Sequence, residues 1–194
     1  YGAPNHTITP GVHLGAADPD SDSAAMPGAS ATGDDTSGSD DEDGITLPAA
    51  FTKGVATTIT ATVAGAGGYL QGWIDWNADG DFADTGEQVI TNVQDNGSGD
   101  TNNTTGTIAV TVTPPATLTA GPSYARFRWS TTSALSATAP AIGGEVEDYA
   151  VTISNSSDYG DAPASYGTPS HAADANLFIG ATAADTESAA MPSA

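Results

Sequence analysis

An acidic stretch between residues 75 and 87 has the residue types and the spacing of a calcium-binding loop. Its oxygen-bearing side chains are Asp75, Asn77, Asp79, Asp81 and Glu87. Gly80 stands at the sixth position, where a chain that folds around an ion must turn sharply. Because Ca²⁺ takes about six to eight hard oxygen ligands, we predict that these five residues bind Ca²⁺, with Asp84 as a reserve ligand.

This stretch differs from the loop of an EF-hand. Its twelfth position is Gly86, and the acid comes one residue later at Glu87. The residues before it have the pattern of a strand, so we expect a loop between two strands. The alternative is a solvated Asp/Asn/Gly turn, since these residue types also favour turns. Five acids within thirteen residues repel one another unless something neutralises them, which favours a bound cation.

A second group of acids precedes the first expected strand. Residues 15–44 carry nine acids and no base. The candidate metal ligands among them are Asp34, Asp40, Asp41 and Asp43. Two interpretations stay open: a second calcium site that fixes this stretch as a joint between domains, or a solvated acidic linker.

Two of the three bases in the chain, Arg126 and Arg128, lie two residues apart on an expected strand, so their side chains point to one face. Glu145 and Glu147 have the matching spacing. We expect cross-strand ion pairs between the two sets. The alternative is a metal site at residues 145–148, which also include Asp148.

Residues suited to catalysis are scarce. The imidazoles are His6, His13 and His171, and the chain has no Cys, no Gly-x-Ser-x-Gly elbow and no His pair at zinc-protease spacing. His6 and His171 occupy the same position of a repeat, and His13 is replaced by Phe178 in the second copy. We expect a protein that is not an enzyme.

Alternating apolar and polar residues predict the elements that must position these side chains. The expected strands are Ile45–Leu47, Val55–Val63, Tyr69–Trp76, Gln88–Val93, Ile108–Val112, Tyr124–Trp129 and Glu147–Ile153. Clusters of Gly, Pro and Asn separate them, and no helical period is present. Seven short strands with turn signals predict an all-β fold, an antiparallel β-sandwich with long irregular acidic connectors, with a closed barrel as the alternative.

The two ends of the chain repeat each other. Residues 166–194 align with residues 1–29 without a gap, matching Tyr, His, Met and two Pro in register. We therefore expect one period of a tandem array and the start of the next. The predicted domains are a connector at 1–44, a sandwich at 45–154 and the next connector at 155–194.

Three motifs resemble one known family. Residues 144–149 read Gly-Glu-Val-Glu-Asp-Tyr, residues 73–82 read Trp-Ile-Asp-Trp-Asn-Ala-Asp-Gly-Asp-Phe, and residues 158–163 read Asp-Tyr-Gly-Asp-Ala-Pro. Together they resemble the GEVED domain of large secreted and surface proteins of bacteria. The resemblance implies an extracellular β-sandwich module, commonly repeated and proposed to bind calcium, without established catalytic activity.

Charge narrows the range of partners. The net charge of −21 would repel nucleic-acid phosphates and anionic lipid, and no apolar run has membrane-spanning length, so neither nucleic-acid binding nor membrane insertion is expected. We expect a structural repeat unit of an extracellular bacterial fibre or stalk, with neighbouring copies of itself as partners. The alternative is a calcium-dependent adhesin of the cell surface that stacks glycans on Tyr69, Trp73, Trp76 or Trp129.

Overall fold

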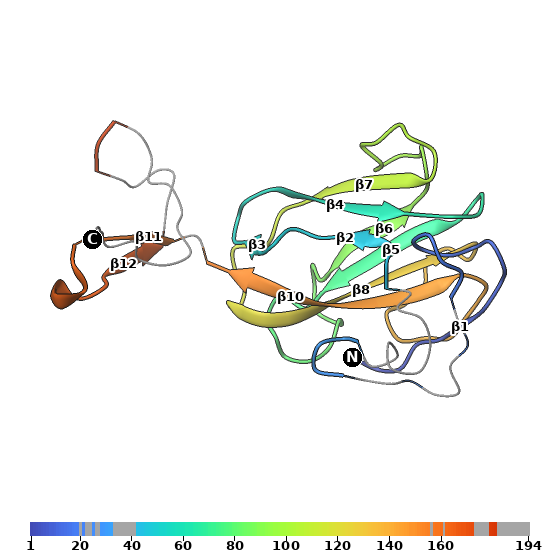
Figure 1. Ribbon diagram of the computed structural model, residues 1–194, viewed down its shortest axis with the longest axis horizontal. Coiled ribbons are helices and arrows are strands. Elements are labelled where there is room, and N and C mark those ends of the chain that lie inside the picture. The colour runs from blue at the N-terminus through green and yellow to red at the C-terminus, as the bar shows by residue number, and fades with distance from the viewer. Residues whose placement is uncertain are drawn as a thin grey trace.

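The regular secondary structure of the described residues is almost entirely β-strand, and a computed structural model shows how the strands stack (Figure 1). It describes residues 1–19, 21, 25, 28–32, 42–155, 157–160, 162–172 and 179–181. Within those ranges the helical content is one short 3₁₀ helix at Ala164–Tyr166. No helix in the described part of the chain is long and apolar enough to cross a membrane.

Two sheets form the body of the molecule. The larger has the strand order β3 (Phe51–Thr52), β10 (Glu145–Ser154), β8 (Gly121–Ser130), β5 (Tyr69–Ile74) and β6 (Gln88–Val93). The smaller has the order β2 (Ile45–Thr46), β4 (Thr57–Thr62) and β7 (Thr107–Val112). Neighbouring strands are antiparallel, except that β3 runs parallel to β10. The predicted all-β sandwich is confirmed.

The core lies between the two sheets. Ile59 and Ala61 of β4 point inward from the smaller sheet, and Phe127 and Trp129 of β8 point inward from the larger one. All seven predicted strands are present. Val55 is an exception to the expected alternation, because its amide closes a turn onto Thr52 before β4 begins, and its side chain is exposed.

The outer face of the larger sheet is covered by the N-terminal segment. Figure 1 shows this segment, in blue, running along the side of the sheet that faces away from β4 and β7. Its strand β1 (His6–Thr7) pairs in parallel with β9 (Ala141–Ile142). Further along, Leu14 bridges to Val63 and is fully buried in the core. The first part of the predicted connector is therefore packed on the sandwich.

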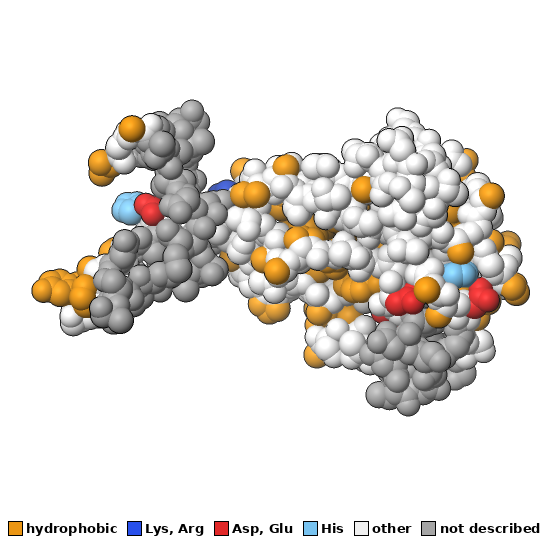
Figure 2. Space-filling view, turned by 45° about the horizontal axis from the view of Figure 1, so that its top comes forward, with side chains coloured by type: hydrophobic (Ala, Val, Ile, Leu, Met, Phe, Trp, Pro, Cys, Tyr) orange, Lys and Arg blue, Asp and Glu red, His pale blue; other side chains and the backbone are white. Residues whose placement is uncertain are grey.

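The C-terminal segment extends away from the sandwich. Beyond β10, strands β11 (Ser157–Tyr159) and β12 (Ser170–Ala172) form a two-stranded antiparallel sheet. Figure 2 shows this part projecting from the body, with hydrophobic side chains at its tip. Isolated two-stranded sheets are only marginally stable in water, so this segment depends on further contacts for its order.

Candidate metal centre

The acidic loop connects β5 to β6 at the edge of the larger sheet. The Ile74 amide donates to the Glu87 carbonyl at 2.9 Å, which closes the base of the loop. Asp75 and Glu87 are therefore held close together by the sheet itself. Both side chains are buried, with Asp75 fully so and Glu87 2% exposed.

Backbone amides of the loop fold around its carboxylates. Asp75 accepts from the Ala78 amide at 2.6 Å and from the Gly80 amide at 3.1 Å. Gly80 adopts a φ of +98°, a conformation that residues with a Cβ rarely adopt. The glycine expected for a sharp turn thus stands where the backbone turns back toward Asp75.

Three of the predicted ligands converge. Asp75, Asp79 and Glu87 each offer one carboxylate oxygen, and these oxygens lie within 4.8 Å of one another. Glu87 Oε2 accepts from the Asp84 amide at 3.1 Å, whereas the buried Oε1 has no hydrogen-bond partner. Burial, followed by the charges of Asp75 and Asp84, raises the pKa of Glu87 to about 7. A buried oxygen without a partner inside an acidic cluster suits a hard cation.

The remaining predicted ligands lie at the rim of this cluster. The Asn77 side-chain amide donates to Asp79 at 3.0 Å and to Asp84 at 2.5 Å, which places it between two carboxylates. Asp81 is exposed, and its carboxylate accepts from the Ala83 amide instead of joining the three converging oxygens. The reserve ligand Asp84 is thus linked to the cluster through Asn77.

The second predicted acidic group is described only in part. Asp34, Asp40 and Asp41 lie outside the described residues. The Asp43 carboxylate accepts from the Ala16 amide at 3.1 and 3.2 Å. This bond joins the end of the acidic stretch to the N-terminal segment.

Tyr1 lies directly on the candidate metal centre. Its hydroxyl donates to Asp75 Oδ2 at 2.6 Å, and its amino group donates to the Gly80 carbonyl at 3.0 Å. The ring packs against Phe82 and Tyr124, with centroids 4.8 and 5.1 Å away. Burial and the hydrogen bond to the Asp75 carboxylate raise the pKa of Tyr1 above its usual value. The first residue of the chain thus completes one wall of the acidic loop.

The expected pairing of the two arginines with Glu145 and Glu147 is wrong. The register places Asp148 opposite Arg126, and Glu147 opposite the core residue Phe127. Arg126 therefore forms a two-pronged bond to Asp148, at 2.7 and 2.6 Å. Glu145 and Glu147 lie on the other face, where they accept from the amides of Leu14 at 2.5 Å and Gly44 at 3.0 Å.

Both arginines also hold the N-terminal segment. Arg126 donates to the Tyr1 carbonyl at 2.6 Å. Arg128 donates through Nε to His6 Nε2 at 2.9 Å and through Nη2 to the Asn5 carbonyl at 3.5 Å. Burial lowers the pKa of Arg128 to about 10, and the charge of Arg126 adds to the effect. Two of the three bases in the chain thus help to hold residues 1–6 in place.

Sequence reasoning missed the roles of Tyr1, His6 and Asp148. A signal for the first two was present, because Tyr and His keep their places in both copies of the repeat. For Asp148, no pattern separates it from its acidic neighbours until the strand register is known.

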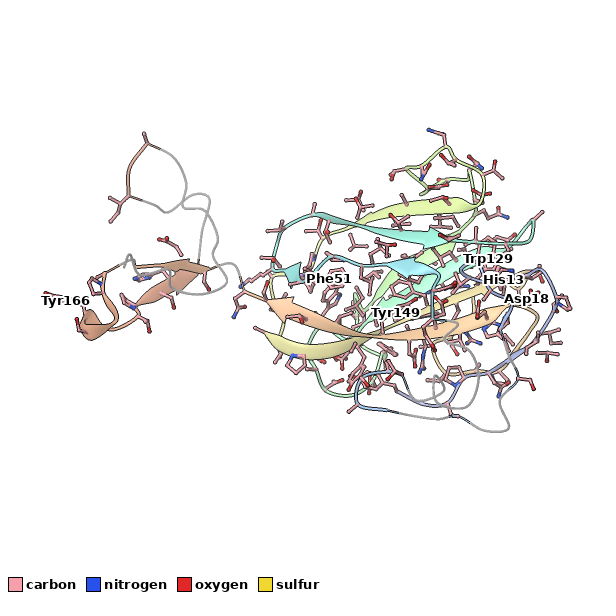
Figure 3. The ribbon with its side chains drawn as sticks, in the orientation of Figure 1. His13, Asp18, Phe51, Trp129, Tyr149 and Tyr166 are labelled. Carbon is pink, nitrogen blue, oxygen red and sulfur yellow. The ribbon has the colours of Figure 1, made fainter. Side chains whose placement is uncertain are left out.

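The tryptophans do not offer an exposed face for sugars. Trp73, Trp76 and Trp129 are all buried, and Trp129 donates its indole N–H to the Ala64 carbonyl at 2.7 Å. Figure 3 shows Trp129 inside the sandwich. These three residues act as core.

The match to a known family lies over the larger sheet and its loops. No curated protein matches the chain. The model of the GEVED domain matches residues 69–152, which run from the start of β5 almost to the end of β10. This span includes the acidic loop, both arginines and the Gly-Glu-Val-Glu-Asp motif at residues 144–148. The chain thus contains a region that is similar to the GEVED domain.

Proposed function

We propose that this chain is a calcium-stabilised structural repeat unit, built into a fibre or stalk outside the bacterial cell. The observation that carries the proposal is the contact of Tyr1 with Asp75. It joins the first residue of the duplicated segment to the candidate calcium ligands. A metal centre and a repeat junction therefore meet at one place in the fold.

The case for Ca²⁺ rests on the donor set. The converging donors are carboxylate oxygens, and the hydrogen bonds of Asn77 place a side-chain amide beside them. Oxygen donors of this kind suit Ca²⁺, whereas zinc sites draw mainly on His and Cys. Asp75, Asp79 and Glu87 would hold the ion, and the ion would supply charge neutralisation that holds the loop in one conformation.

The case for a structural role rests on repetition and charge. A repeat of 165 residues is long enough for each period to contain a whole sandwich and its connector. In such an array, each connector joins one sandwich to the next. A chain with 24 acids and three bases repels itself, and bound Ca²⁺ relieves that repulsion at the junction.

The adhesin alternative gains no support from the aromatic residues. It requires exposed rings beside the acidic loop, yet Trp73 and Trp76, which flank Asp75, are buried. We therefore prefer the structural role.

Thermal unfolding in excess Ca²⁺ and in excess chelator tests the metal assignment. We expect the midpoint temperature Tm to rise with Ca²⁺, because a ligand that binds the folded state stabilises it. Asp79→Asn removes one converging carboxylate and should shrink the rise, whereas Asp158→Asn removes the same charge outside the loop and should leave it unchanged. An equal Tm with and without Ca²⁺ would refute the assignment.

Electron microscopy of the native material tests the structural role. Regular fibres with the repeat of one module, loosened by chelator, are the expected result. Isolated particles or single flexible strings would favour the adhesin instead.

A further inference from the structure

The duplicated segment keeps two polar side chains through which its first copy contacts the sandwich. Tyr1 and His6, which bind Asp75 and Arg128, are repeated as Tyr166 and His171. Leu14, which is 0% exposed, is repeated as the apolar Ile179. The contacts that the side chains of Tyr1, His6 and Leu14 make in the first copy can therefore be made by the second.

Gly15 is also repeated, as Gly180. In the first copy, this position has no room for a side chain. A Cβ at Gly15 would lie 1.3 Å from Asp43 Oδ1, and its φ is +69°. A residue with a side chain at this position would collide with the end of the acidic stretch. The second copy thus keeps the glycine that this close approach requires.

Between positions 1 and 7 the two copies differ at three residues. Ala3, Asn5 and Thr7 are exposed in the first copy, and they become Thr168, Ser170 and Ala172 in the second. The sandwich binds Asn5 and Thr7 through their backbone carbonyls, from the amides of Ala141 at 2.9 Å and Gly143 at 3.0 Å. Such contacts tolerate a change of side chain. Within positions 1–7, the differences therefore fall at side chains that are exposed in the first copy.

In this structure the described residues of the second copy, 166–172 and 179–181, lie away from the sandwich. Its strand β12 pairs with β11, and Figure 3 places Tyr166 at the far end of this hairpin, away from the sandwich. Tyr166 is 79% exposed and Ile179 is fully exposed. The residues at the positions of Tyr1 and Leu14 are thus presented to solvent in the second copy.

We propose that the repeated segment, through Tyr166, His171 and Ile179, binds the sandwich of a second copy at the site that residues 1–15 occupy here. At that site, the Tyr166 hydroxyl donates to Asp75 of the second copy, and His171 accepts from its Arg128. Ile179 fills the core position of its Leu14. The inference rests on the proposed repeat function and deepens it, because it names the segment that joins neighbouring modules.

The first test uses the full chain and weakens the binding of residues 1–15 to their own sandwich. The double variant Tyr1→Ala/His6→Ala weakens the chain's own segment, which otherwise competes at high effective concentration. Sedimentation velocity should then show dimers and longer oligomers that grow with protein concentration. Adding Tyr166→Ala and His171→Ala should return the chain to a monomer, whereas adding the control Val55→Asp should not. A folded double variant that stays monomeric would overturn the proposal.

A second test leaves Tyr1 and His6 unchanged, in case the double variant does not fold. Thr7 pairs with Ile142, so Ala172 of another copy would take the same place. Neighbouring strands lie about 4.8 Å apart, within the Cα range of a disulfide. The chain has no native Cys. Under oxidation, Ala172→Cys/Ile142→Cys should form at least tenfold more intermolecular disulfide than the control Ala172→Cys/Val55→Cys. Equal cross-linking in both would overturn the proposal.

Both tests are run with Ca²⁺ and with chelator, so that two failures can be told apart. Association without any effect of Ca²⁺ on Tm would sustain the docking and refute the metal assignment. A rise of Tm with Ca²⁺ but no association would sustain the metal assignment and refute the docking.

Discussion

Glu87 is a buried acid whose ionisation opposes folding while no cation is present. Its pKa of about 7 in the folded chain exceeds the ordinary 4.5, so the folded state binds more protons between these values. In chelator, its contribution to stability is therefore greatest below pH 4.5 and is lost as the pH rises through 7. Bound Ca²⁺ would reverse this preference, because a metal ligand must be ionised.

Glu87→Gln should separate these two effects. In chelator at pH 8 we expect a rise in Tm of about a few degrees, because the buried charge is gone. In excess Ca²⁺ the variant should show no further rise, because a ligand is gone. Calorimetry in both buffers measures the outcome, with Asp158→Asn as the control for charge. A variant that still gains Tm from Ca²⁺ would remove Glu87 from the site.

His6 is held in its neutral form by two neighbours. Arg128 donates to Nε2, so Nδ1 carries the proton and donates to the Gly143 carbonyl at 3.0 Å. Burial, aided by the charge of Arg128, lowers the pKa of His6 to about 4. The neutral ring therefore contributes stability that is fully present above pH 6.5 and is lost as the pH falls toward 4.

A histidine titration by NMR tests this assignment. We expect His6 to stay neutral until the pH approaches 4. In denaturant unfolding, the stability advantage of the native chain over His6→Ala should shrink between pH 7 and pH 4. A His6 that titrates near 6.5 would show that its ring does not contact Arg128 in solution.

At the scale of elements, the pairing of β8 with β10 decides which acid meets which base. Glu145 and Glu147 share the spacing of the two arginines, and the sequence therefore favours them as partners. In a strand, however, a shift of one residue moves every side chain to the other face. The actual register turns Asp148 toward Arg126, a detail that spacing cannot supply.

Asp148→Asn should loosen the N-terminal segment. The substitution leaves Arg126, which is almost fully buried, without its carboxylate partner. We expect a loss of about 2 kcal/mol in the free energy of unfolding and faster hydrogen exchange at residues 5–7. Mass spectrometry of exchanged peptides measures the second effect. Unchanged exchange at β1 would indicate that Arg126 does not anchor the segment.

Most of the elements that the sequence predicts are those with a period. β4 and β7 alternate over six residues each, and β6 is predicted with its bounds intact. The strands that the sequence misses, such as β1, β3 and β9, are two residues long and have no period to detect. They depend on tertiary contacts, as β1 does on β9.

The residues of the candidate site also fall into two groups, those that local spacing predicts and those that only the fold brings together. Asp75, Asp79 and Glu87 are recognised because the loop brings its own residues together over a short span of chain. Tyr1 reaches Asp75 across 74 residues, and only the fold supplies that contact. Local spacing therefore predicts the acidic side chains of the candidate site, but it does not predict that Tyr1 packs over them.

At the scale of the whole molecule, the net charge of −21 acts on stability everywhere. Salt screens this self-repulsion, with a Debye length of about 10 Å at 0.1 M. In chelator we therefore expect Tm to rise as NaCl is raised from 0.02 to 0.5 M. Differential scanning fluorimetry measures the rise, and Mg²⁺ at matched ionic strength separates screening from site binding. A Tm that does not change with salt would show that the acids are far enough apart to be tolerated.

The long ladder between β8 and β10 has a mechanical consequence. β10 leads directly into the C-terminal segment, so tension on that segment enters the sandwich along the axis of β10. The hydrogen bonds of an antiparallel ladder lie across the strands, so this tension shears nine residue pairs at once instead of opening them in turn. A module loaded in this way resists stretching with the whole ladder between β8 and β10. This arrangement would suit a fibre that must bear force.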